Sequence, residues 1–405
     1  MSEKLTVKNV VNINKSTLSA KDNWSTLKYL DTGNITENQI DTLQIFQKGE
    51  KLPSRAKRKV EKGTIIYSTV RPNQKHFGYF DTHSNDLVVS TGFATLDVID
   101  PRINSKYLYY LLTQNSVISQ LQSIGENSTS SYPSIRPEDI GNLSFVFPDI
   151  DIQNKIADIL TSIDKKIQIN NQINQELEAM AKTLYDYWFV QFDFPDQNGK
   201  PYKSSGGKMV YHPELKREIP EGWGVSNLFD AAEVQYGYPF STDYFNSTGE
   251  GVPVIRIRDI LGNDITNYST EEVEDKYRIN VGDVLIGMDG NFHMNYWIKE
   301  NCYLNQRVVK VNSDKLPNMV LKYQIEPFIK LREKSVSRTT VGHLSDKDLK
   351  AINVILPKDK CLSSIFEKFE SILENIIINQ QQNQELTQLR DWLLPMLMNG
   401  QVKVE

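Results

Sequence analysis

The feature that most constrains the fold of this chain is an internal repeat at a constant offset of 209 residues. Residues 170–177 read NNQINQEL and residues 379–386 read NQQQNQEL, so six of the eight letters agree. The same offset matches Pro148 with Pro357 and carries SIRPEDIGNLSFVFP onto HLSDKDLKAINVILP. A repeat of this length predicts two structurally similar halves, because each copy encodes the same succession of elements.

Upstream of these segments the two copies still match, but the offset drifts. VEKGTIIYS resembles INVGDVLIG, which sets Gly63 opposite Gly282, and Trp24 has a counterpart in Trp223. Runs such as GTIIYS and VPVIRIRDI are rich in β-branched residues between turn signals and predict strands. SKYLYYLLTQNSVISQL and NMVLKYQIEPFIKLRE predict shorter helices. The chain order is therefore a globular part of mixed α and β structure, a long helix, a second such globular part and a second long helix.

The two long helices share a heptad pattern. The first series, taken every seventh residue, is Ile156, Ile163, Asn170, Leu177 and Leu184 in one helix and Ile365, Ile372, Asn379, Leu386 and Leu393 in the other. The second series, four residues later, is Leu160, Ile167, Asn174, Ala181 and Trp188 in one helix and Phe369, Ile376, Asn383, Arg390 and Leu397 in the other. This pattern predicts the seam of a coiled coil, and about 36 residues per helix correspond to roughly 54 Å.

Asparagine interrupts this seam at the same two positions of each helix, Asn170 and Asn174 in one and Asn379 and Asn383 in the other. A seam amide costs stability because it must be desolvated, but it is tolerated opposite another amide and penalises a slipped register. We therefore expect the helices to pack on each other, with these four residues fixing the register. The alternative is a solvent-facing Gln/Asn-rich tract. The pattern leaves the direction open, because a parallel pair sets Asn170 against Asn379 and an antiparallel pair sets it near Asn383.

The composition is that of an ordinary globular protein, with 39% hydrophobic and 24% charged residues and a net charge of −5. The 405 residues are enough for two or three domains. Two cysteines in a chain of this length favour a reducing compartment over a disulfide framework. The amino-terminal segment lacks the apolar run of a signal peptide, and no apolar stretch is long enough for a membrane span. These features predict a cytoplasmic protein with no membrane partner.

Recognisable catalytic motifs are scarce. Gly207–Lys208 lacks the other residues of a P-loop, no Pro-Pro of an amino-methyltransferase loop occurs, and the cysteines and histidines are not at metal-ligand spacing. One nuclease-like pattern consists of Asp196, preceded by proline, followed by Glu214 and Lys216. It indicates, as an alternative, a stand-alone metal-dependent nuclease. Both parts fall in a connector rich in Gly, Ser, Pro and Lys rather than on adjacent predicted strands, which argues against this alternative.

Binding chemistry is better represented than catalysis. Residues 48–75 carry nine Lys and Arg residues against two Glu residues, and Asn, Gln, His and aromatic residues are interleaved in RPNQKHFGYF. Lys and Arg suit DNA phosphates, while Arg, Asn and Gln can pair with base edges in the major groove. The alternative for each region is a solvated basic surface. The candidate DNA-binding residues are Lys57, Arg58, Lys59, Arg71, Gln74 and Lys75 in this region, and Arg256, Arg258, Arg307 and Arg338 in a second, less densely charged one.

Three segments carry a resemblance to a known family. NQINQELEAMAKTLYDYWFVQFDFPD, the IPEGW that begins at residue 219, and the closing LRDWLLPMLMNGQV resemble the specificity (S) subunit of type I restriction-modification systems. The resemblance implies an α+β fold with a pseudo-twofold internal repeat, in which two mixed α/β target recognition domains are separated by two long antiparallel coiled-coil helices. The implied boundaries are 1–150 for the first target recognition domain, 151–195 for the central conserved helix, 196–222 for a connector, 223–357 for the second target recognition domain and 358–405 for the C-terminal conserved helix.

The resemblance also implies the function. Each domain would read one half of a bipartite site on double-stranded DNA, and the helices would set the spacing and dock two modification (methyltransferase) subunits. Restriction (translocase and nuclease) subunits would join the same enzyme. S-adenosylmethionine, ATP and Mg²⁺ would be bound by these partner subunits, and this chain would hold no cofactor and perform no catalysis. A coiled-coil interaction protein without DNA binding is the remaining alternative.

Overall fold

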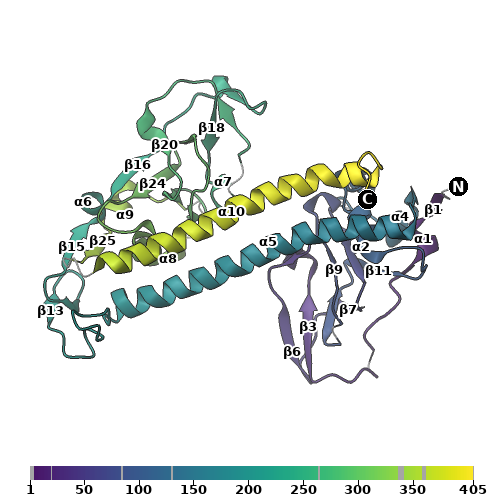
Figure 1. The fold of residues 1–405 in the computed structure, drawn as a ribbon, viewed down its shortest axis with the longest axis horizontal. Coiled ribbons are helices and arrows are strands. Elements are labelled where there is room, and N and C mark those ends of the chain that lie inside the picture. Colours follow the sequence, from purple (N-terminus) through teal and green to yellow (C-terminus); the bar gives the residue numbers. More distant parts are fainter. Residues whose placement is uncertain are drawn as a thin grey trace. The chain divides into compact units, whose positions relative to one another are not determined.

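The computed structural model describes residues 4–19, 21–83, 85–128, 131–262, 265–335, 342–357 and 362–404. The chain forms two compact units, one from Met1–Lys165 with Leu386–Glu405 and one from Lys166–Glu385. Two long helices, α5 (Ile150–Tyr185) and α10 (Ser363–Met398), contribute residues to both units (Figure 1). Each has 36 residues, the length that the heptad pattern predicts. Among the described residues, no helix combines the length and the apolar character needed to cross a bilayer.

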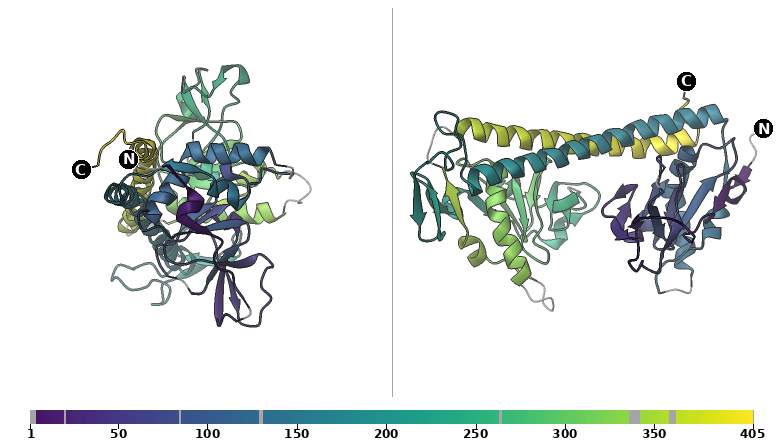
Figure 2. Two further views of the ribbon diagram at one scale, coloured as in Figure 1. Left: turned by 90° about the vertical axis from the view of Figure 1, so that its right-hand side faces the viewer. Right: turned by 90° about the horizontal axis from the view of Figure 1, so that it is seen from below.

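The first unit is built around two four-stranded sheets, which Figure 2 shows from two further sides. One sheet has the order β2 (Val11–Ile13), β11 (Phe93–Val98), β8 (Ile65–Ser68) and β9 (Phe77–Tyr79). The other has the order β6 (Gln44–Gln47), β3 (Thr26–Leu30), β10 (Leu87–Ser90) and β7 (Ala56–Lys59). Two smaller pairs are β1 (Lys4–Thr6) with β12 (Ser144–Val146) and β4 (Ile35–Thr36) with β5 (Gln39–Ile40). The short helices are α1 (Val7–Val10), α2 (Ser105–Leu112), α3 (Asn115–Glu126), α4 (Pro137–Gly141), η1 (Thr32–Asn34) and η2 (Pro72–Gln74).

The second unit contains a corresponding pair of sheets. One has the order β16 (Glu233–Tyr236), β24 (Val308–Asn312), β21 (Val284–Gly287) and β22 (Met294–Tyr296). The other has the order β17 (Phe245–Asn246), β19 (Tyr268–Ser269), β18 (Val252–Ile255), β23 (Cys302–Leu304) and β20 (Arg278–Ile279). The two smaller pairs are β13 (Met209–His212) with β14 (Arg217–Pro220) and β15 (Gly224–Asn227) with β25 (Asn353–Leu356). The helices are α6 (Leu228–Ala231), α7 (Asp259–Gly262), α8 (Asn318–Ser335), α9 (Asp346–Lys350), η4 (Thr242–Tyr244), η5 (Asp275–Tyr277) and the π-helical turn η3 (Asp186–Val190).

The strand orders confirm the internal repeat that the sequence predicts. The order β2-β11-β8-β9 corresponds to β16-β24-β21-β22, and β6-β3-β10-β7 corresponds to β19-β18-β23-β20. The pairs β3/β10 and β18/β23 are both parallel, while their neighbours are antiparallel. The paired glycines Gly63 and Gly282 precede β8 and β21 with φ of 91° and 90°, a conformation that favours glycine. The two halves of the chain therefore share one topology.

Most of the apolar seam residues of α5 and α10 are buried, and several belong to the cores of the units. Ile156 and Leu160 of α5 belong to the same core as Leu394 and Leu397 of α10 in the first unit. Ala181 of α5 packs in the second core, together with the α10 residues Ile365, Phe369, Ile372 and Ile376. The helices therefore stabilise each unit by burying one apolar stripe, as a heptad seam does.

Residues 196–222, predicted as a connector, contain the β13–β14 hairpin and are anchored at both ends. The ring of Phe194 stacks on Tyr202 and on Trp223, with centroids 4.7 and 4.9 Å apart. Ile219 is buried in the same core, at 3% exposure. Trp223 is also buried there, so it anchors the start of the second globular part.

Candidate nucleic-acid interface

Three of the candidate residues lie on β7, which pairs with β10. Lys57 is exposed, whereas Lys59 forms an ion pair with Asp22. Arg58 is half-buried, and its Nε atom has no hydrogen-bond partner among the described residues. Burial lowers the pKa of the Arg58 guanidinium from its usual value, yet arginine keeps its charge in proteins. Lys57 is therefore available to a ligand, while Lys59 is already engaged and the Arg58 Nε atom is buried.

The other three candidates of the first basic region surround η2, at the end of β8 in the other sheet. Arg71 has a φ of 47°, and its guanidinium lies over the ring of Tyr132, with Cζ 5.6 Å from the ring centroid. Gln74 is exposed. Lys75 also has a positive φ, 56°, and forms an ion pair with Glu37. The six candidates thus belong to two sheets, three on β7 and three around η2 after β8.

The three described arginines of the second region each face a carboxylate. Arg256 donates from Nη2 to Thr266 Oγ1 at 2.8 Å, and its Nε lies 3.6 Å from Asp259 Oδ2. Arg258 is exposed and lies 3.9 Å from the other oxygen of Asp259. Arg307 lies 3.3 Å from Asp289. Arg338, the last candidate, lies outside the described residues.

The ends of β8 and β21 have the same backbone geometry, which we call the strand-end frame. In the first unit it consists of the bonds Thr69 N–H to Gly92 O at 2.9 Å, Ile135 N–H to Thr69 O at 2.9 Å and Arg71 N–H to Pro133 O at 2.8 Å. In the second unit it consists of Met288 N–H to Arg307 O at 3.0 Å, Leu344 N–H to Met288 O at 2.7 Å and Gly290 N–H to Gly342 O at 2.9 Å. The frame therefore equates Arg71 with Gly290 and Gly92 with Arg307, so each unit presents an arginine where the other has glycine.

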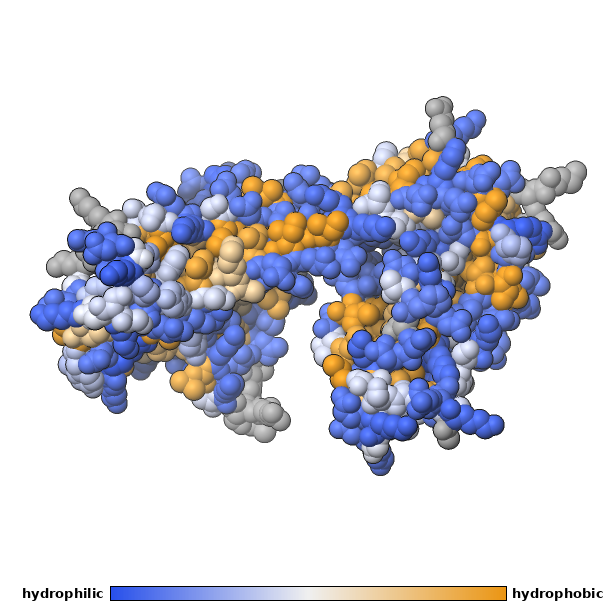
Figure 3. All heavy atoms as spheres, turned by 60° about the horizontal axis from the view of Figure 1, so that its bottom comes forward, coloured by the Kyte–Doolittle hydropathy of each residue, from blue (hydrophilic) through white to orange (hydrophobic). Residues whose placement is uncertain are grey.

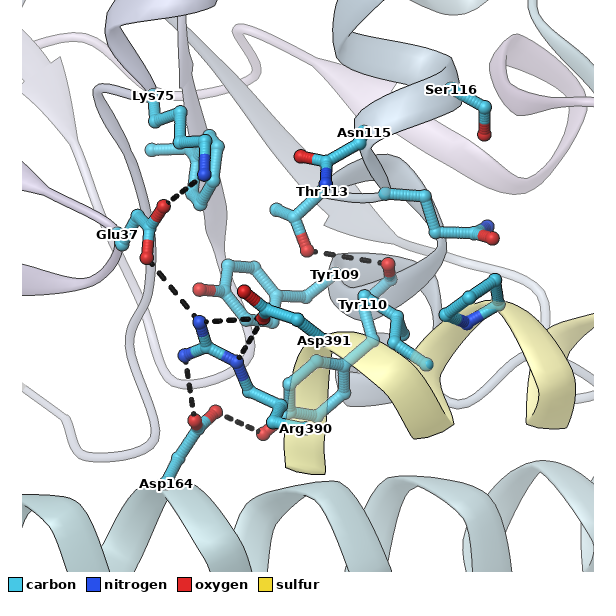
Figure 4. A pocket seen from close by; sticks show the side chains of 14 residues that line it. Glu37, Lys75, Tyr109, Tyr110, Thr113, Asn115, Ser116, Asp164, Arg390 and Asp391 are labelled. Carbon is cyan, nitrogen blue, oxygen red and sulfur yellow. Dashed lines mark hydrogen bonds and ion pairs between the residues drawn. The ribbon is translucent and has the colours of Figure 1, made fainter. Parts of the chain in front are cut away.

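Figure 4 shows a polar cluster in a pocket of the first unit that sequence reasoning missed as a site. Arg390 of α10 lies 3.2 Å from Asp164 of α5 and 3.4 Å from Glu37, which in turn pairs with Lys75. Tyr110 Oη donates to Asp164 at 2.6 Å. The chain from Arg390 through Glu37 to Lys75 links the carboxy-terminal helix to the η2 segment. The one signal in the sequence was a lone charge in the seam series, where every other residue is apolar or Asn.

The four seam asparagines meet across α5 and α10 in the second unit. Asn170 Nδ2 donates to Asn383 Oδ1 at 2.9 Å, and Asn379 Nδ2 donates to Asn174 Oδ1 at 2.9 Å. Asn170 and Asn174 are 1% and 7% exposed, so they are not part of a solvent-facing tract. The pairing of 170 with 383 and of 174 with 379 makes the helix segments antiparallel, which settles the direction that the sequence left open. That these amides fix the register stays a prediction.

The nuclease pattern is placed on turns. Asp196 Oδ1 accepts the backbone N–H groups of Asn198 and Lys200, both at 2.8 Å. Glu214 and Lys216 lie in the turn between β13 and β14. Among the residues that the structure describes, no group of three or more His, Cys, Asp and Glu side chains is arranged to hold a metal ion. This geometry gives the nuclease alternative no support.

Two topologically equivalent α/β domains, each followed by a long helix and each with arginine at exposed strand ends, define a duplicated recognition protein. The model of the family described as "Type I restriction modification DNA specificity domain" matches residues 2–179 and 220–388. The chain belongs to this family, and its two mixed α/β domains are the target recognition domains of a specificity subunit. The family match supports neither the nuclease nor a coiled-coil protein without DNA.

Two relatives are similar in sequence over most of this chain, and one solved structure is similar in fold. The chain is 25% identical to the type I restriction enzyme HindI specificity subunit of Haemophilus influenzae, with 92% of this chain and 94% of the relative covered. It is 27% identical to the MjaIX specificity subunit of Methanocaldococcus jannaschii, with 93% and 84% covered. The fold is similar to the crystal structure of the type I restriction-modification S subunit from M. genitalium, with a TM-score of 0.56, 16% identity, and 98% and 95% of the two chains covered.

Proposed function

We propose that this chain is the DNA-reading subunit of a type I restriction-modification enzyme, in which each domain reads one half of a bipartite site on double-stranded DNA. The observation that carries the proposal is the strand-end frame, which is common to both domains but carries different side chains. A shared backbone with exchanged arginines suits two half-sites of different sequence, because base readout depends on side chains. Arg71 and Gln74 serve the first half-site in this proposal, and Arg256, Arg258 and Arg307 serve the second.

The long helices are the scaffold in this proposal, setting the spacing between half-sites and docking two modification (methyltransferase) subunits. Two of the exposed apolar residues on α5, Ile169 at 49% and Met180 at 48%, have exposed apolar counterparts 209 positions later on α10, Ile378 at 42% and Leu389 at 43%. Figure 3 shows such exposed apolar surface among hydrophilic residues. Two equivalent positions on two helices favour two copies of one partner, because exposed apolar residues that recur at fixed positions mark interaction sites.

The proposal assigns the chemistry to the partner subunits in the cytoplasm. The modification subunits bind S-adenosylmethionine and methylate DNA, while the restriction subunits use ATP and Mg²⁺. This chain contributes recognition and assembly and no catalytic group. The supporting observation is that candidate DNA-binding residues are numerous in the sequence, whereas the one nuclease-like pattern, Asp196 with Glu214 and Lys216, lies on turns.

A domain exchange tests the function. Residues 1–150 are replaced by those of a relative with a different target, and the methylated motif is read from the genome of cells that carry the complete system. We expect one half of the bipartite motif to change while the other half and the spacer stay the same. The matched exchange of residues 223–357 should change the other half only. A motif in which both halves change after either exchange contradicts the assignment of one half-site per domain.

A further inference from the structure

A three-residue cluster lies at the strand-end frame of the second domain. Asp289 Oδ2 faces Arg307 Nε at 3.3 Å, and Asp289 Oδ1 faces His343 Nδ1 at 2.6 Å. Asp289 and His343 also form a β-bridge. The Arg307 side chain keeps 53% of its surface exposed, whereas Asp289 keeps 30%. The Asp289 carboxylate therefore contacts Arg307 through one oxygen and His343 through the other. Of the Arg307 guanidinium, it faces the Nε atom.

The first domain has no such cluster at the same place. The frame equates Asp289, Arg307 and His343 with Val70, Gly92 and Ser134. Valine and glycine offer no charged side chain, so this arrangement is particular to the second domain. A cluster that the common fold does not require points to a task that only one domain performs.

We propose that Arg307 reads a guanine in the major groove of the second half-site, and that Asp289 is its positioning residue. This inference rests on the proposed function. An arginine binds the O6 and N7 atoms of guanine through two N–H groups. Because Asp289 faces Nε, the terminal Nη1 and Nη2 atoms are left for the base. The ion pair also limits the rotamers of Arg307, so less side-chain entropy is lost when DNA binds.

The neighbouring carboxylate favours a base over a phosphate as the ligand. A phosphate group near Arg307 would approach Asp289 as well, and the two negative charges repel each other. A base edge carries no net charge and meets no such repulsion. The other described candidates of this domain are arranged differently, because Arg256 already donates to Thr266 and Arg258 is only loosely held, 3.9 Å from Asp259.

The test uses the assembled enzyme with Arg307→Ala and Arg307→Lys, and equilibrium binding to duplexes in which each position of the second half-site is varied. We expect Arg307→Ala to lower discrimination at one guanine roughly ten- to hundredfold while the first half-site is read as before. Arg307→Lys should restore little of this discrimination, because the point charge of an ammonium group does not reproduce two fixed N–H groups. Asp289→Asn should weaken discrimination at the same guanine, a change that loss of stability alone does not produce.

Arg332→Ala is the matched control. Arg332 lies on α8 of the same unit and forms a comparable ion pair with Asp348, at 3.2 Å. This variant should leave the base preferences unchanged. If Arg307→Ala weakens binding to every duplex equally and Arg307→Lys restores the binding, Arg307 contacts a phosphate and the inference is overturned. Unchanged discrimination in either Arg307 variant overturns it too. Both results leave the domain exchange intact, so failure here is distinct from failure of the proposed function.

Discussion

Arg390 of α10 and Asp164 of α5 form an ion pair of 3.2 Å within the helix seam of the first unit, where the repeat has apolar residues at both equivalent positions. Those positions are Ala181 and Leu373, both buried in the second unit. The seam is therefore asymmetric, because the Arg390–Asp164 ion pair has no charged counterpart in the second unit. If two copies of α10 packed together in this register, Arg390 would face Leu373. If two copies of α5 did so, Asp164 would face Ala181. Either pairing would leave a charge without its partner across the seam.

Replacing Arg390 should destabilise the first unit. Arg390 is 17% exposed and faces Asp164, Glu37 and Asp391, so Arg390→Ala leaves several carboxylates without their cation. We expect a loss of about 2 kcal/mol in the free energy of unfolding, less than for a fully buried pair. Chemical denaturation of the purified chain measures it. Arg136→Ala is the control, because that arginine is 78% exposed and its ion pair contributes little.

The double variant Asp164→Leu with Arg390→Ala copies the apolar seam of the second unit into the first. It removes both members of the ion pair, so it should be more stable than Arg390→Ala alone. The comparison uses the same denaturation curves. If the double variant loses as much free energy of unfolding as the two single variants together, the two charges do not interact.

The seam asparagines should lower the stability of the helix pair and restrict it to one register. Asn379→Leu alone deprives the buried amide oxygen of Asn174 of its donor and should cost about 1–3 kcal/mol. Leucine at all four positions should instead raise the melting temperature and allow mixed registers. Thermal melting and cysteine cross-linking between α5 and α10 measure the two effects. If the quadruple variant keeps a single register and assembles normally, the amides have no specifying role.

Glu37 should make the first unit sensitive to acid. Burial raises the pKa of this carboxyl, but the hydrogen bond and charge of Lys75 and the charge of Arg390 lower it more, so the pKa lies below its usual value. A lowered folded-state pKa stabilises the fold above the unfolded-state pKa, and this contribution is lost as the pH falls through the folded-state pKa. Glu37→Gln should therefore be less stable than the natural chain at neutral pH, and the difference should shrink below about pH 4.5. Denaturation midpoints over this range measure it, and a difference independent of pH contradicts it.

The exposed apolar residues of α5 and α10 should bind the partner subunits. Ile169→Lys should remove one modification subunit from the assembled enzyme, and Ile378→Lys should remove the other, because a charge in an apolar contact must be desolvated. The mass of the complex in solution gives the stoichiometry. Leu331→Lys on α8 is the control, since Leu331 is 69% exposed but lies outside both long helices. Two bound modification subunits in the Ile169→Lys, Ile378→Lys double variant rule out this surface.

The isolated chain should bind its DNA site weakly and with a modest dependence on salt. Its net charge is −5, and Lys59, Lys75 and Arg307 are already paired with carboxylates. Few counterions are released from DNA when few unpaired Lys and Arg side chains contact its phosphates. Fluorescence anisotropy at two salt concentrations, with and without modification subunits, measures this. Nanomolar affinity of the chain alone at physiological salt contradicts the prediction.

Periodic and local features of the fold were predictable from the sequence. The heptad series gave the 36-residue helices and their buried seam, because a helix repeats its environment every few residues. The drifting offset still matched Gly63 with Gly282, because the turn before each strand requires the same backbone angle. Both results depend on residues close together in the chain.

Features that depend on distant residues were not predictable. Paired asparagines satisfy either helix direction, so the antiparallel arrangement required coordinates. Arg390 and Glu37 are far apart in sequence, and no local pattern connects them. The equivalence of Gly92 with Arg307 was hidden because insertions shift the offset between the globular parts. Candidate residues chosen by charge alone could not be divided into those already paired, such as Lys75, and those available to a ligand.

The strand-end frame consists of main-chain bonds only, and this has a consequence for how such proteins diversify. In the proposed function, a point mutation at position 307 changes a base contact without removing any main-chain bond of the frame. New target preferences can therefore arise in one half of the molecule by single steps, each passing through a folded intermediate, while the other half keeps its old preference.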